Sequence, residues 1–158
     1  MDPSLDDPYR LMRLYMGLRD QLMGHLTDDA LGFSPGGGNP PLSDLCRQIG
    51  EVQTSYIQSF RTFEQDFSYR HPDSTIGGSV EGLQSWYEEL DADLEMALDQ
   101  LSANDLAARI DRGGGFEVTP AIQLEIYKEA LLIFYGKTSV YLKALDIQLG
   151  GRWESWIE

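Results

Sequence analysis

The chain has 158 residues, of which 42% are hydrophobic and 24% charged, and its formal net charge is −14. This length suits one domain with a single core, and the composition is that of a globular protein rather than a disordered one. The excess of carboxylates disfavours binding to nucleic acid or to an anionic membrane surface, because lysine and arginine supply most of the affinity for both.

The first predicted helix runs from about residue 8 to residue 26. A loop follows from Gly32 to Pro41, and its glycines and prolines cannot continue a helix. The apolar residues of the helix recur at intervals of three and four, which places them on one helical face. They are Leu11, Tyr15, Leu18, Leu22 and Leu26.

The second predicted helix covers about residues 42–67 and ends before the proline and glycines of residues 70–78. Ser79 is a suitable N-cap for the third, which covers about residues 79–101. Both show an apolar stripe at helical spacing. The stripes are Leu42, Leu45, Ile49, Val52, Tyr56, Phe60, Phe63 and Phe67 in the second, and Leu83, Tyr87, Leu90, Leu94, Ala97 and Leu101 in the third.

The fourth predicted helix covers about residues 120–145, with Thr119 as N-cap and Pro120 at the first helical position. Its predicted inward residues are Ile122, Ile126, Ala130, Ile133, Phe134, Tyr141 and Leu145. No segment shows the alternation typical of a strand, and four one-sided helices must pack on one another. We therefore predict a single all-α domain, residues 1–158, built as a four-helix bundle. We expect Trp153 and Trp156 in the tail to pack onto the bundle or onto a second subunit.

Two stretches resemble a known family. In residues 35–52, Gln48 precedes an apolar–Gly–Glu step, and residues 130–137 lead into the apolar helix end of residues 140–145. The stretch at residues 35–52 is similar to the entry into helix two of the DinB/YfiT-like family, where a histidine usually precedes this step. The stretch at residues 130–137 resembles the closing motif of that family, His-x-x-x-His-Arg-Gly-Gln. Helix and loop spacing match over nearly the whole chain, so the resemblance implies a DinB/YfiT-like bundle.

Metal-binding members of this family hold a divalent ion with three histidines from two helices. The resemblance places these ligands at Gln48, Ala130 and Phe134. An amide oxygen is a poor ligand for a transition metal, and the other two side chains have no ligating atom. We therefore expect a degenerate metal site without a cofactor, in which Phe134 fills the former ion site. Zinc or nickel could bind only through surrogate ligands, which are Gln48, Glu51 or Glu129.

The other chemically active side chains have simpler structural interpretations. Glu51, Glu125 and Glu129 could form a carboxylate metal site, but no Glu-x-x-His motif accompanies them, and a solvated face is favoured. His25 lies where it can contact carbonyls at a helix end, and His71 lies in a loop. The lone cysteine, Cys46, lies beside an apolar stripe, which favours a buried structural thiol.

Lys137 lies near the inward face of the fourth predicted helix and needs a partner there, for which Glu51 and Asp44 are candidates. Structural pairing is favoured over ligand binding. The alternative is a small polar pocket at the former metal end. Its candidate lining residues are Gln48, Glu51, Tyr127, Lys137 and Tyr141.

Three functions follow from these observations. The missing histidines and the lack of a complete catalytic set favour a non-catalytic, repurposed bundle, stress-associated or ligand-binding, and relatives imply a homodimer. The second function is a metal- or thiol-dependent transferase or isomerase with surrogate ligands, and the third is an interaction module recognised through its acidic surface. The sequence has neither a signal peptide nor paired cysteines, so we expect a cytoplasmic protein.

Overall fold

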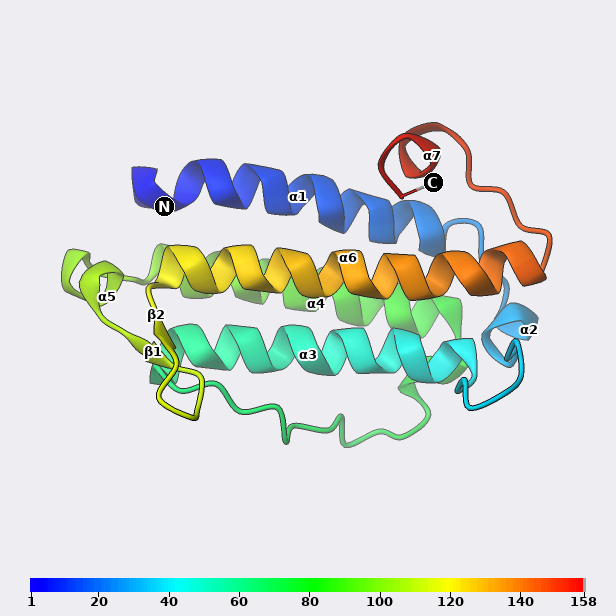
Figure 1. Cartoon of the computed structure of the whole chain (residues 1–158), viewed down its shortest axis with the longest axis horizontal. Coiled ribbons are helices and arrows are strands. Elements are labelled where there is room, and N and C mark those ends of the chain that lie inside the picture. The colour runs from blue at the N-terminus through cyan, green and yellow to red at the C-terminus, as the bar shows by residue number, and fades with distance from the viewer. Residues whose placement is uncertain (158) are drawn as a thin grey trace.

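The computed structural model describes residues 1–157, except for the side chain of residue 7. Over this range four long helices pack as a bundle (Figure 1), which confirms the predicted all-α fold. The long helices are α1 (Pro3–Met23), α3 (Leu42–Thr62), α4 (Val80–Asp99) and α6 (Pro120–Ala144). The short elements are α2 (Asp28–Leu31), the 3₁₀-helix η1 (Ile76–Gly78), α5 (Ala103–Ala107), β1 (Ile110–Asp111), β2 (Glu117–Val118) and α7 (Gly151–Ile157).

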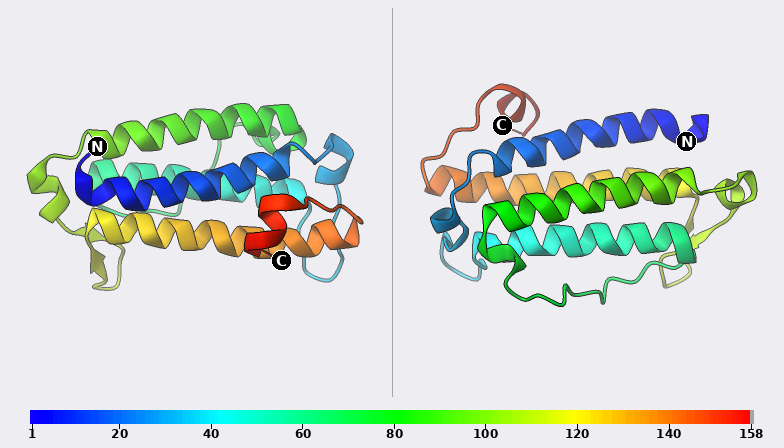
Figure 2. Two further views of the ribbon diagram at one scale, coloured as in Figure 1. Left: turned by 90° about the horizontal axis from the view of Figure 1, so that it is seen from above. Right: turned by 180° about the vertical axis from the view of Figure 1, so that it is seen from behind.

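Each long helix packs against two others around one core. α3 contacts α4 and α6, and α1 contacts the same two helices from the other side. Figure 1 shows α6 at the front between α1 and α3, with α4 behind it, and Figure 2 shows the same arrangement from above and from behind. No helix within the described residues is long and apolar enough to cross a membrane.

Two helix ends differ from the prediction by five residues. α1 begins five residues earlier than expected, because the Asp2 side chain accepts from the Ser4 N–H and Pro3 fits the first turn. α3 ends at Thr62 because Phe63 adopts a left-handed conformation, with φ 59°, and closes the helix by donating to the Ser59 carbonyl. Phe67 therefore lies outside the helix and is exposed, so its predicted inward position is wrong.

The predicted N-caps are confirmed. The Ser79 hydroxyl accepts from the Gly82 N–H at 3.0 Å, and the Thr119 side chain accepts from the Ile122 N–H. The antiparallel β1–β2 hairpin was not predicted, because two-residue strands are too short to show an alternating pattern. The tail returns to the bundle as α7, where buried Trp153 packs its ring 5.3 Å from that of Tyr135.

The buried face of α6 is rotated from the predicted one. Ile122 and Ile133 were expected inside, but they are 49% and 61% exposed. The helix carries apolar residues on both sides, so the sequence pattern fits more than one face. Its buried residues are Pro120, Gln123, Leu124, Tyr127, Leu131, Phe134, Tyr135, Thr138, Ser139, Tyr141 and Leu142.

A charged network crosses the core between α1, α3 and α4. The fully buried Arg19 guanidinium donates to Asp91 at 2.6 and 2.7 Å and to the Gln53 amide oxygen at 2.6 Å, and it lies over the Tyr87 ring. A buried charge is tolerated only when it is paired in this way. The network fixes how these three helices meet, while α6 closes the bundle with its own buried face.

Candidate ligand-binding site

A groove between α3 and α6 contains the three positions at which the resemblance places metal ligands. Gln48, Ala130 and Phe134 all line this cavity of about 160 Å³. Phe134 is only 5% exposed, so its ring is part of the core at the groove floor. The other lining residues are Leu45, Ile49, Val52, Ile133 and Lys137.

The groove does not provide a donor set that fits a transition-metal ion. Its only polar side chains near those positions are the neutral amide of Gln48 and the ammonium group of Lys137. Among the described side chains, no three His, Cys, Asp or Glu residues gather closely enough to hold a metal. On α6, Glu125 pairs with Lys128, and Glu129 is exposed.

A larger polar cavity lies beside the groove, on the outer side of α3. This cavity, the α3 pocket, has a volume of about 470 Å³, and Gln48 lines both it and the groove. The long segment that joins α3 to η1 runs alongside α3 (Figure 1) and supplies Phe67 and Arg70 to the pocket. The remaining lining residues are Pro40, Asp44, Arg47, Glu51, Val52 and Ser55.

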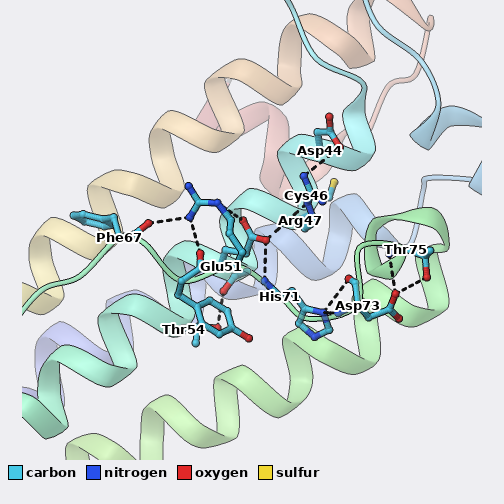
Figure 3. Close-up of polar contacts among 12 residues, drawn as sticks. Asp44, Cys46, Arg47, Glu51, Thr54, Phe67, His71, Asp73 and Thr75 are labelled. Atoms are coloured by element: carbon cyan, nitrogen blue, oxygen red, sulfur yellow. Dashed lines mark hydrogen bonds and ion pairs between the residues drawn. The ribbon is translucent and has the colours of Figure 1, made fainter.

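The centre of the α3 pocket is a nearly buried carboxylate, Glu51, which is 6% exposed. It accepts a hydrogen bond of 3.0 Å from the His71 main-chain N–H (Figure 3). The Nε atoms of Arg47 and Arg70 lie 3.8 and 3.9 Å from its oxygens, which is too long for hydrogen bonds. The Arg47 Nε is buried and has no hydrogen-bond partner among the described residues.

Helical spacing explains how α3 presents this site. Arg47, Glu51 and Ser55 are each four residues apart, so they lie along one face of the helix. Arg70 comes from the joining segment, where it also donates to the carbonyls of Phe67 and Tyr69 at 2.9 and 2.6 Å. The sequence pattern pointed to Glu51 but to neither arginine as a site residue, and Arg70 lies in a segment without helical periodicity.

The structure places the other predicted pocket residues differently. Lys137 is exposed and lies on the groove, while Glu51 and Asp44 pair with arginines, so the expected ion pair of Lys137 is wrong. Tyr141 lines an adjoining hollow of about 340 Å³ with Gln48 and Lys137, and its hydroxyl donates to the Pro40 carbonyl at 2.6 Å.

Tyr127 lines none of these three cavities. It is fully buried, its ring lies 4.9 Å from that of Tyr56, and its hydroxyl has no hydrogen-bond partner among residues 1–157. Burial raises the pKa of Tyr127 well above its usual value. This phenol therefore stays protonated inside the core and takes no part in a solvent-facing site.

The cysteine and the histidines also have structural contacts. Cys46 is fully buried, which confirms the predicted structural thiol, and burial raises its pKa to about 12. Nδ1 of His25 lies 2.9 Å from the Gln21 carbonyl, one helical turn earlier. The His71 ring packs 4.7 Å from the Trp86 ring, and the His71 main-chain N–H donates to Glu51.

No protein-family model matches the chain, and no curated protein matches it either. Its structure is similar to the DinB-like protein YjoA of Bacillus subtilis, with 14% identity and a TM-score of 0.66 over 85% of this chain and 88% of that one. A DinB-like protein of Bacillus cereus shares 14% identity with a TM-score of 0.72 over 91% and 94% of the two chains.

A third similar structure is the mycothiol-dependent maleylpyruvate isomerase, with 15% identity and a TM-score of 0.67. The match covers 82% of this chain and 58% of the isomerase. All three likenesses concern the fold, and they confirm the DinB-like bundle that the sequence resemblance implied.

Proposed function

We propose that this chain is a repurposed DinB/YfiT-like bundle that binds a small carboxylate in the α3 pocket rather than a metal ion in the groove between α3 and α6. The observation that carries this proposal is the pair of arginines held around nearly buried Glu51. The donor-poor groove supports the loss of metal chemistry, since Ala130 and Phe134 have no ligating atoms.

The arginines favour a carboxylate because their own contacts leave donors free. Each lies beyond hydrogen-bond distance of Glu51, and a guanidinium binds a carboxylate through two parallel hydrogen bonds. Ser55 and Gln48 add a hydroxyl and an amide to the wall, and the Phe67 ring adds an apolar surface. Glu51 keeps both positive charges in place, so a ligand meets a preorganised site.

The proposal is tested with maleate and succinate as probes, with inorganic phosphate for comparison. Calorimetry and thermal unfolding should show binding of a dicarboxylate, and a ligand at a hundred times its Kd raises the free energy of unfolding by about 2.7 kcal/mol. Arg47→Gln should abolish the shift, whereas the control Arg61→Gln should keep it, because Arg61 pairs with Asp93 outside the pocket. Equal shifts in both variants, or none in the wild type, would overturn it.

A second candidate is a thiol-dependent isomerase or transferase, which the likeness to the mycothiol-dependent maleylpyruvate isomerase supports. This activity needs surrogate ligands such as Gln48, Glu51 or Glu129, or a mechanism without a metal. Maleylpyruvate turnover with added thiol, measured with and without zinc or nickel, tests it. Turnover that disappears in Gln48→Ala would favour this candidate over a non-catalytic binding protein.

A further inference from the structure

The outward side of α6 carries an uncovered row of apolar residues. Among the described residues, nine large apolar side chains are exposed, and three of them, Ile122, Ile133 and Val140, lie on this helix. Single exposed apolar residues are ordinary, but an aligned row marks an interaction surface. We call this row with its neighbours the α6 stripe, which consists of Ile122, Ile126, Glu129, Ala130, Ile133, Gly136, Lys137 and Val140.

Helical geometry places the α6 stripe on one continuous face. At about 100° per residue, every member lies within about 60° of Ile133 around the helix. Each member is exposed or partly exposed, and Figure 1 shows α6 at the front of the bundle with α1 and α3 beside it. α7 packs elsewhere, because Trp153 contacts Tyr135 on the buried side of α6.

Two opposite charges interrupt the stripe at symmetrical positions. Glu129 precedes Ile133 by four residues, and Lys137 follows it by four. Both are exposed, and neither forms an ion pair with another described side chain. The nearby Glu125 already pairs with Lys128. A partner helix that suits this face must therefore offer a lysine opposite Glu129 and a carboxylate opposite Lys137.

A second copy of α6, running antiparallel, meets this requirement. If a two-fold axis passes beside Ile133, Glu129 of each copy lies level with Lys137 of the other, and Ile126 lies level with Val140. A parallel arrangement instead places like charges together. Ala130 and Gly136 fall at the same level, and a Cβ on Gly136 would meet nothing within 4 Å in its own chain, so two helices can approach closely there.

We propose that the α6 stripe is the interface of a homodimer in which α6 pairs antiparallel with its copy around Ile133. Ala130, Ile133 and Lys137 also line the groove beside Gln48, so the second copy covers that groove. The interface goes beyond the proposed ligand site, because no α6 residue lines the α3 pocket. The proposed dimer and the proposed carboxylate binding can therefore be contradicted independently of each other.

Sedimentation equilibrium across a wide concentration range tests the interface with charge reversals. Glu129→Lys or Lys137→Glu places like charges together twice per dimer and should weaken association roughly tenfold or more. The double variant Glu129→Lys/Lys137→Glu restores both pairs and should dimerise like the wild type. Mixing the two single variants should give a heterodimer, since opposite charges then meet at both positions.

Glu89→Lys on α4 is the matched control, because it reverses an exposed charge away from the stripe. It should leave association unchanged, and circular dichroism verifies the fold of every variant. A wild type that stays monomeric at all concentrations would overturn the proposal. The proposal would also be overturned if the single charge reversals left the dimer intact. It would likewise be overturned if the double variant failed to dimerise like the wild type.

Discussion

The neighbouring helices α3 and α6 differ in what they turn outward. Both helices bury a mixed face, with Gln53 and Ser59 on α3 and Gln123 and Thr138 on α6. The exposed residues of α3, such as Gln48 and Gln58, are polar, whereas α6 exposes a row of apolar residues. The comparison shows that apolar spacing identifies the buried face only when a helix serves the core alone. A helix with a second apolar contact surface gives a pattern that fits several faces.

The sharpest test of this comparison uses two adjacent residues of α6. Phe134→Ala should lower the free energy of unfolding by about 3–5 kcal/mol, because it removes a buried ring. Ile133→Ala should change it by only about 0.5 kcal/mol, because that side chain is 61% exposed. Both are measured by urea unfolding in the Glu129→Lys background, at a concentration low enough for the weakened dimer to dissociate into monomers. Similar losses at both positions would contradict the observed orientation of α6.

The fold was largely predictable because four long segments each carry a helical period and caps such as Ser79 and Thr119. These are local signals that survive packing. The position of Phe67 was not predictable, because the end of α3 depends on the left-handed conformation of Phe63. No strong breaker such as proline or glycine stands there in the sequence. The outward positions of Ile122 and Ile133 were not predictable either, because α6 carries apolar residues on both sides and its sequence pattern fits more than one face.

The candidate site was only half predictable. Gln48 and Glu51 were identified because they lie beside a motif with helical spacing, and the structure places both on the α3 pocket. Arg70 and the His71 N–H reach Glu51 from a long joining segment. Such a contact depends on where the chain runs after α3, which no local pattern records. The ion pair of Lys137 with Glu51 or Asp44 was wrongly predicted for the same reason, because no local pattern shows that Arg70 reaches Glu51.

The next prediction concerns the buried side of α3. Gly50 lies against the Trp86 ring of α4, and an added Cβ would come within 2.4 Å of it. Gly50→Ala should therefore lower the free energy of unfolding by about 1–3 kcal/mol through overpacking, despite its higher helix propensity. Thermal and urea unfolding measure this loss. A stabilised variant would show that α3 and α4 can separate at this point without cost.

A smaller effect on the free energy of unfolding is expected from the cap at the start of α6, which α3 lacks. α3 follows Pro41 without a side-chain cap, whereas Thr119 caps α6 through its hydroxyl. Thr119→Ala should lower the free energy of unfolding by about 1 kcal/mol, because a main-chain N–H loses its partner. Thr119→Ser keeps the oxygen and should retain most of the stability. An equal loss in both variants would assign the effect to the threonine methyl group instead.

The smallest effect should be a gain in the free energy of unfolding, and it concerns Gly136 on the outward side of α6. A Cβ added to Gly136 meets nothing within 4 Å, so Gly136→Ala gains helix propensity without a clash. In the Glu129→Lys monomer it should raise the free energy of unfolding by about 0.5–1 kcal/mol, whereas Gly50→Ala lowers it. The same exchange on two neighbouring helices then changes sign according to what lies beyond the glycine. A loss at Gly136 in the monomer would mean that this face of α6 is covered within a single chain, which would contradict both the comparison with α3 and the proposed interface.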